Sequence, residues 1–151
     1  MLSKILDQFP KTEDYLIEIL LKYQSCKEKK QITKEEIAMI AKHLNLAPSK
    51  VSSVVAFYTF FSTEERGQHI VQVCYDVPCY VTAEVDVLKT LEDLLGIKVG
   101  ETTKCRTFTI EHTSCLGCCD EAPAMRIGTK TYTNLTKEKI KKIISEYGGK
   151  K

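Results

Sequence analysis

The sequence contains few residues that break regular structure and no long apolar run. Seven glycines and four prolines occur among its 151 residues, with no low-complexity segment and no internal repeat. Collagen-like and disordered chains are therefore excluded, and the 43% of hydrophobic residues indicates a globular protein with a packed core. No stretch approaches the roughly 20 consecutive apolar residues that a membrane-spanning helix requires, so we expect no direct membrane insertion.

An excess of charge of one sign is also lacking. The chain has 22 Lys and Arg residues against 20 Asp and Glu residues, a formal net charge of +2, and both halves mix the two signs. Nucleic-acid binding depends on a concentrated positive surface that displaces counterions from phosphates. We therefore expect no nucleic-acid partner.

Targeting signals and nucleotide-binding loops are missing as well. The first residues, MLSKILDQFPKTEDYL, have neither the apolar segment nor the cleavage site of a secretory signal, and they are too acidic for a transit peptide. We expect a cytoplasmic protein, either free or at the cytoplasmic face of a membrane complex.

No G-x-G-x-x-G follows a strand and no Walker A loop occurs, so we expect no flavin, nicotinamide or catalytic site in this chain itself.

The first half of the chain, up to about residue 65, has the periodicity of short amphipathic helices. Apolar residues recur every three or four positions in three segments, near residues 16–23, 37–44 and 51–58. Thr33 and Glu36 form a capping-box pattern before the second segment, and Pro48 stands where a first-turn proline starts the third. None of these helices is long enough to be stable alone. We therefore predict a helical bundle over residues 1–66.

The second half, residues 67–151, alternates strands with helices. We predict the order β, α, β, β, β, α, which is a small mixed sheet covered by helices. The predicted strands are HIVQV, RTFTIEHT and a hairpin of AMRIG and KTYTN, and the predicted helices are residues 80–95 and LTKEKIKKIISEYGG. Thr136 is the expected N-cap of the last helix, and the boundary between the halves falls between residues 62 and 68.

Seven cysteines are many for this length, and an odd number disfavours a complete set of disulfides. Two groups follow predicted strands: Cys74 and Cys79 in CYDVPC, then Cys115, Cys118 and Cys119 in CLGCC. Cysteines at rigid strand ends can hold their sulfurs at the fixed separations that a compact metal centre needs. Cys79 also precedes the helix predicted at residue 80, whose N-terminus is expected to stabilise a thiolate.

Three kinds of site fit such paired cysteines. Structural zinc usually uses two-residue gaps, whereas four residues separate Cys74 from Cys79. A dithiol oxidoreductase has a C-x-x-C at the start of a helix, but no amphipathic helix follows Cys115 and Cys118. Iron–sulfur ligation is the favoured interpretation, zinc and a redox disulfide remain alternatives, and Cys118 or Cys119 can complete the set.

Several segments carry a family resemblance: VSSVVAFYTFF, VCYDVPCYV, GIKVGETT, SCLGCCDEAPAMRIG and TYTNLTKEKIKKII. They resemble the thioredoxin-like [2Fe–2S] subunit of NADH-quinone oxidoreductase and of related NAD-linked, often electron-bifurcating, hydrogenases and formate dehydrogenases. The resemblance implies an N-terminal helical bundle followed by a thioredoxin-like α/β [2Fe–2S] domain. Its ligands fall on four residues of this sequence: Cys74, Cys79, Cys115 and Cys119.

Five further positions have expected roles beside the four ligands that the resemblance implies. Cys118 occupies a place where the family has a small residue that is not a ligand. Gly117 is expected to adopt a backbone φ that other residues resist. Pro123 stands where the thioredoxin fold often has a cis-proline. Cys26 and Cys105 lie outside both groups and are expected to bind no metal.

The resemblance implies an electron-transfer subunit, a part of an NADH-dependent oxidoreductase without a catalytic site of its own. Its [2Fe–2S] cluster would exchange single electrons with FMN in a partner flavoprotein that binds NAD(H) and carries an iron–sulfur cluster. Further subunits of a quinone reductase, hydrogenase or formate dehydrogenase would complete the assembly, and residues 1–66 would dock the flavoprotein. Alternatives are a stand-alone ferredoxin and, as a more distant possibility, a zinc-stabilised interaction module.

Overall fold

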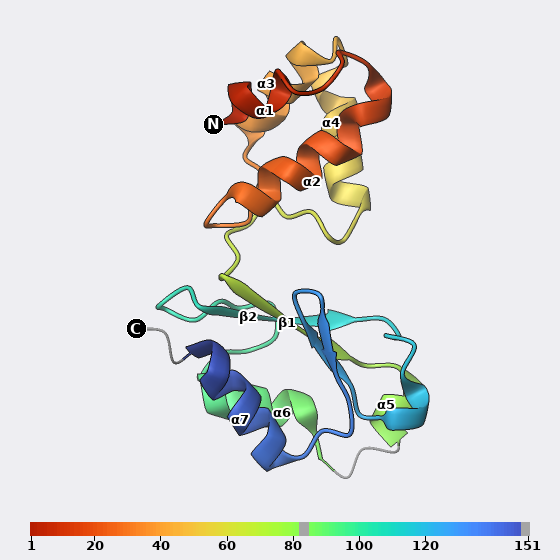
Figure 1. The fold of residues 1–151 in the computed structure, drawn as a ribbon, viewed down its shortest axis with the longest axis vertical. Helices are drawn as coiled ribbons and strands as arrows, with labels where there is room; N and C mark the ends of the chain where they lie inside the picture. Colours follow the sequence, from red (N-terminus) through yellow and green to blue (C-terminus); the bar gives the residue numbers. More distant parts are fainter. Residues whose placement is uncertain (82–84, 149–151) are drawn as a thin grey trace. The chain divides into compact units, whose positions relative to one another are not determined.

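The computed structural model describes residues 1–81 and 85–148. The chain separates into two compact units, Met1–Arg66 and Gly67–Lys151. The first is entirely helical, and the second combines a sheet with helices (Figure 1). Each unit has its own cluster of buried hydrophobic residues, so each is described by itself.

The first unit contains the three predicted helices: α2 (Leu16–Cys26), α3 (Lys34–His43) and α4 (Pro48–Phe57). The capping box is confirmed, because Thr33 Oγ1 accepts from the backbone of Glu36 while the Glu36 carboxylate accepts from the backbone of Thr33. Pro48 lies in the first turn of α4, as predicted. These local signals set where the helices begin.

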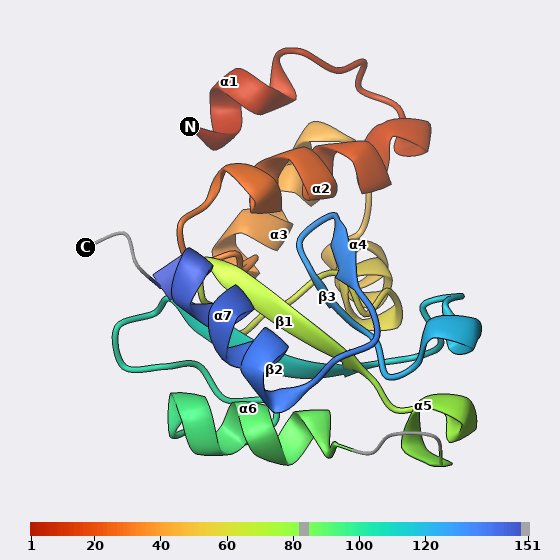
Figure 2. The same ribbon diagram turned by 60° about the horizontal axis from the view of Figure 1, so that its bottom comes forward.

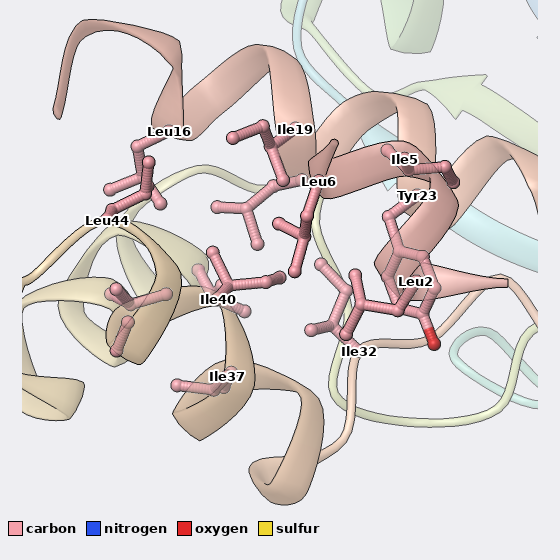
Figure 3. Close-up of a cluster of buried hydrophobic side chains, with 14 of the residues drawn as sticks. Leu2, Ile5, Leu6, Leu16, Ile19, Tyr23, Ile32, Ile37, Ile40 and Leu44 are labelled. Carbon is pink, nitrogen blue, oxygen red and sulfur yellow. The ribbon is translucent and has the colours of Figure 1, made fainter. Parts of the chain in front are cut away.

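Two further elements were not predicted: helix α1 (Leu2–Leu6) and the 3₁₀ turn η1 (Glu13–Tyr15). Helix α1 is only five residues long, too short for apolar periodicity to register. Its apolar side chains nevertheless join the core of the unit, which Figure 3 shows in close-up. Gln24 of α2 holds the chain that follows α4: its side-chain amide donates to the Phe60 carbonyl at 2.7 Å and accepts from the Ser62 N–H at 2.9 Å.

The second unit is built on a four-stranded sheet in the order β2-β1-β3-β4. Its strands are β1 (His69–Cys74), β2 (Phe108–Thr113), β3 (Met125–Ile127) and β4 (Lys130–Tyr132). Strands β1 and β2 are parallel, β1 and β3 are antiparallel, and β3 and β4 form the predicted hairpin. Figure 2 shows β1 and β2 running side by side. The predicted mixed α/β architecture is confirmed.

Helices α6 (Val87–Leu95) and α7 (Lys137–Gly148) cover one face of this sheet. Val71 and Val73 of β1 are buried with Leu91 of α6 and Ile140 of α7 in one hydrophobic cluster. Alternate residues of a strand share a face, so both helices pack on the face that Val71 and Val73 occupy. The predicted cap of α7 is confirmed, since Thr136 Oγ1 accepts from the backbone of Lys139 at 3.2 Å.

The single helix predicted over residues 80–95 is wrong. The structure has a short helix α5 (Val77–Val81) and then α6, which begins only at Val87. Asp86 lies between them in extended backbone, and its side chain accepts from the backbone of Lys89 at 2.9 Å. An aspartate that caps a helix in this way ends the preceding segment and starts a new one. Part of the predicted helix, residues 82–84, lies outside the described residues.

Within residues 1–81 and 85–148, no helix has the length and apolar character needed to cross a membrane.

Candidate metal centre

The two predicted cysteine groups meet at one edge of the sheet. Cys74 is the last residue of β1, and in the parallel pairing it lies opposite Thr113, the last residue of β2. Parallel strands end at the same edge, so the loop that follows β2 begins beside Cys74. This loop carries Cys115, and the 3₁₀ turn η2 (Cys119–Glu121) follows it. Cys79 lies on helix α5 (Val77–Val81), which follows β1.

Cys115 and Cys119 form the exposed pair of the centre. Their sulfur atoms lie 3.2 Å apart, and the backbone N–H of Gly117 donates to the Cys115 sulfur at 3.4 Å. Gly117 has the predicted unusual backbone, with a φ of +80° that L side chains rarely adopt. This turn folds the loop back, so that residues four positions apart face each other.

Cys74 and Cys79 form the buried pair, with only 6% and 5% of their surfaces exposed. They pack with Ala124, whose carbonyl accepts from the backbone N–H of Cys74 at 3.2 Å. The bond between Ala122 and the neighbouring Pro123 is cis, a point that the sequence left open. A cavity of about 340 Å³ borders both cysteines and reaches Pro123.

The surroundings of Cys79 and Cys119 raise the pKa values of these two thiols. Burial, and then a hydrogen bond with the Cys74 thiol, raise the pKa of Cys79. The hydrogen bond with Cys115 raises the pKa of Cys119 to about 11, and charges on Cys79 and Cys74 act in the same direction. Thiols that repel each other's negative charge in this way become good ligands once a metal replaces their protons.

One expectation about Cys79 is wrong. A helix N-terminus was expected to favour its thiolate, but Cys79 is the third residue of α5, a helix of five residues. Burial is the largest influence on this thiol, because desolvation disfavours the charged form. The pKa of Cys79 is therefore raised rather than lowered.

Cys118 lies apart from the exposed pair, although it adjoins Cys119 in the sequence. Its sulfur is 3.7 Å from the carbonyl oxygen of Leu116, and it packs with Leu116 and Ala122 against the buried cysteines. Its side chain is half-buried, whereas those of Cys115 and Cys119 are exposed. Cys118 and Cys119 therefore have different surroundings, and Cys119 is the one that faces Cys115.

Cys105 and Cys26 belong to neither pair. Cys105 is in the turn before β2, and the six-residue strand, about 20 Å long at 3.3 Å per residue, separates that turn from the loop of Cys115. Cys26 ends α2 in the first unit and is exposed.

Cys105 has an unusual environment that was not predicted from the sequence. Its sulfur lies 3.4 Å from the hydroxyl of Thr103 and 3.2 Å from that of Thr107. These hydroxyls stabilise the thiolate and lower the pKa of Cys105 to about 7. The signal was present in the sequence as TKCRT, a cysteine flanked by threonines two positions away on each side.

Four cysteines in two neighbouring pairs are a donor set that fits a two-iron centre. A [2Fe–2S] cluster takes its cysteines in pairs, two on each iron. The exposed pair and the buried pair match that requirement.

A mixed sheet that brings two cysteine pairs to one edge is the arrangement of a thioredoxin-like iron–sulfur protein. Residues 2–148 match the family described as thioredoxin-like [2Fe-2S] ferredoxin. The chain belongs to this family, and its cofactor is a [2Fe–2S] cluster. The family membership that the sequence motifs predict is thereby confirmed.

Named relatives are subunits of oxidoreductases. The chain is 37% identical over 111 residues to a subunit of the NADH-quinone oxidoreductase of Rickettsia felis, and the match covers 74% of this chain and 66% of that protein. It is 31% identical over 144 residues to the HndA subunit of the NADP-reducing hydrogenase of Solidesulfovibrio fructosivorans, covering 95% of this chain and 83% of that protein. This chain thus spans just under two thirds of the Rickettsia protein.

A solved structure supports the fold. The crystal structure of NAD+-reducing [NiFe]-hydrogenase in the H2-reduced state superposes on 94% of this chain with a TM-score of 0.78. The sequence identity is 18%, and the match covers 23% of the hydrogenase chain. At this identity the likeness shows the shared fold.

Proposed function

We propose that this chain is the electron-transfer subunit of a multisubunit NAD(H)-linked oxidoreductase. The observation that carries the proposal is the convergence of Cys115 and Cys119 with Cys74 and Cys79 at one sheet edge, in a chain whose sequence has no nucleotide-binding loop. The names of the relatives, components of a quinone oxidoreductase and of a hydrogenase, support the same class of complex.

The four cysteines have different tasks in this proposal. Cys74 and Cys79 hold one iron from the buried side, where they pack with Ala124. Cys115 and Cys119 hold the other iron from an exposed loop, the side that a redox partner can approach. The bound cluster supplies one-electron transfer, which complements a flavin that receives two electrons together as hydride.

The proposed partner is a flavoprotein that binds NAD(H), FMN and an iron–sulfur cluster of its own. A one-electron centre without a substrate site needs such a partner, because hydride transfer requires a flavin or nicotinamide cofactor. Further subunits of a quinone reductase or hydrogenase would then pass the electrons on. All seven cysteines are free thiols, which suits the reducing cytoplasm, and we propose that location.

We further propose that the helical unit docks the flavoprotein. The unit has its own core and does not supply any of the proposed ligands. Aromatic side chains cluster at the end of α4, and two of them are exposed: Phe57 at 77% and Phe60 at 43%. Exposed aromatic groups of this kind mark protein–protein contacts.

Anaerobic co-purification tests this function. A tagged full chain should bring down a flavoprotein, and NADH should bleach the visible absorption of the cluster only when that flavoprotein is present. A Cys105→Ser variant serves as the matched control, since it changes an exposed thiol outside the centre. Isolation of a coloured chain that never associates with a flavoprotein would instead favour a free ferredoxin, and one zinc per chain in place of iron would contradict the centre itself.

A further inference from the structure

The two cysteine pairs differ sharply in their access to solvent. Cys74 and Cys79 are buried, while Cys115 and Cys119 are both exposed. A small-molecule oxidant can therefore reach the second pair more easily than the first, since thiol oxidation depends on access to the sulfur. The asymmetry matters whenever the protein holds no cluster, because its sulfurs are then unprotected.

The sulfur atoms of the exposed pair are also nearly close enough to form a disulfide bond. The sulfurs of Cys115 and Cys119 lie 3.2 Å apart, and a disulfide bond is about 2.04 Å long. An approach of about 1.2 Å joins them, and both belong to a loop between β2 and η2 rather than to a strand or long helix.

We propose that Cys115 and Cys119 form a reversible disulfide in the cluster-free protein and that this disulfide blocks cluster insertion. The oxidant is a small-molecule disulfide of the glutathione type. One cysteine sulfur attacks it, forms a mixed disulfide and releases one glutathione thiol; the second cysteine then attacks the mixed disulfide and releases the other. The two thiol protons of the protein end on the two glutathione molecules, so atoms and electrons balance.

The neighbouring cysteines are poorly placed for the same reaction. Cys118 directs its sulfur to the Leu116 carbonyl and packs against the buried group of Cys74, Cys79 and Ala124. A bond between Cys118 and Cys119 would join residues whose Cα atoms are about 3.8 Å apart, below the range of about 4.4 to 6.8 Å found in disulfides. Cys74 and Cys79 interact through their thiols but are covered.

The disulfide acts on cluster assembly rather than on electron transfer. An oxidised pair cannot supply two thiolates to an iron, so only a reduced loop accepts the cluster. Once the cluster is in place, its irons occupy the same sulfurs and protect them from the oxidant. Assembly of the centre thereby becomes dependent on the thiol redox state of the cell.

Differential alkylation of the full chain tests the proposal. Cluster-free protein is prepared by chelation without oxygen and incubated with glutathione disulfide; free thiols are alkylated, and the remainder are reduced and alkylated with a second reagent. We expect Cys115 and Cys119 to be joined by a disulfide bond, whereas the exposed thiols of Cys105 and Cys26 can be lost only as glutathione adducts, which the mass of the non-reduced chain distinguishes. Circular dichroism confirms that oxidised and reduced samples keep the same fold. A disulfide that includes Cys118, oxidation of Cys74 and Cys79 at the same rate, or seven unreacted thiols would overturn the proposal.

Matched variants sharpen the result. Cys118→Ser should still form the disulfide, whereas Cys119→Ser should stop at a glutathione adduct on Cys115. Cys105→Ser removes the other reactive exposed thiol and should leave the disulfide unchanged. A disulfide that persists in Cys119→Ser contradicts the assigned pair.

Reconstitution provides a second readout. The oxidised chain should take up no cluster from ferrous iron and sulfide, and treatment with dithiothreitol should restore uptake in full. Equal uptake by oxidised and reduced chains would overturn the blocking role. The proposal rests on the ligand assignment made under the proposed function, yet it fails separately: the disulfide is measured without iron or partner, and a missing flavoprotein would not alter it.

Discussion

The sulfur atoms of Cys115 and Cys119 face each other at 3.2 Å, although Cys118 is the nearer neighbour in sequence to both. The turn at Gly117, with its φ of +80°, brings about this pairing by reversing the loop. Adjacent residues in such a loop direct their side chains differently, and Cys118 packs against the buried group of Cys74, Cys79 and Ala124 instead. The relationship makes the ligand choice directly testable.

Replacing Cys119 by Ala should abolish or severely destabilise the cluster, because one iron would lose a thiolate. Replacing Cys118 by Ala should leave iron content and the visible spectrum nearly unchanged, since the Cys118 sulfur bonds only weakly to the Leu116 carbonyl. Iron and acid-labile sulfide analysis of anaerobically purified protein, at two of each per chain in the unaltered protein, measures both effects. Colourless Cys118→Ala protein would mean that Cys118 is the ligand.

Much of this centre follows from local signals in the sequence. The strand HIVQV indicates where Cys74 lies, and the glycine in CLGCC indicates a turn. The proximity of Cys115 and Cys119 to the buried pair depends on the parallel pairing of β1 with β2 across more than thirty residues. Such pairing is a tertiary fact that periodicity does not contain.

The incorrect helix over residues 80–95 has a similar cause. Val81, Val85 and Leu88 keep the three-to-four spacing of a helix across a point where the backbone is extended. Apolar spacing alone therefore does not detect the break, while Asp86, a good N-cap residue, does. Helix α1 was missed because five residues hold too little periodicity, and its stability comes from burial of Leu2, Ile5 and Leu6.

Gly67→Ala should destabilise the second unit. A Cβ at this position would lie 2.8 Å from the carbonyl carbon of Phe108, and backbone atoms of β2 have little freedom to move. Overpacking of this kind costs about 1 to 3 kcal/mol, visible as a lower midpoint of urea unfolding. Gly148→Ala is the matched control, because its Cβ would meet only the Phe108 ring at 3.5 Å. Equal midpoints for the two variants would contradict the clash at Gly67.

Thr107→Val should slow the alkylation of Cys105 at neutral pH. The hydroxyls of Thr103 and Thr107 lower the pKa of Cys105 to about 7, so about half of this thiol is ionised at that pH. Loss of one hydroxyl moves the pKa upward toward the ordinary value of about 8.5, which reduces the thiolate fraction several-fold.

Site-resolved mass spectrometry of the alkylated chain gives the rate at Cys105 as a function of pH. The rate profile should shift to higher pH in Thr107→Val, while Thr107→Ser, which keeps a hydroxyl, should retain the original profile. Identical profiles for the valine and serine variants would show that the hydroxyl does not act on the thiol.

The last prediction concerns the helical unit. Removal of residues 1–66 should leave a coloured protein, because all four proposed ligands and the core of the sheet lie in the second unit. The truncated chain should nevertheless bind the flavoprotein more weakly, since the exposed aromatic side chains of α4 are gone. Phe57→Ser tests the surface without deletion: Phe57 is 77% exposed, so the substitution should spare stability and weaken binding. Met39→Ser, at an exposed position of α3 in the same unit, is the control that should bind normally. The affinity for the flavoprotein is measured for the unaltered chain, the truncated chain, Phe57→Ser and Met39→Ser. Full affinity of both the truncated chain and Phe57→Ser would place the docking surface elsewhere. Equal weakening by Met39→Ser would show that the aromatic group has no special role.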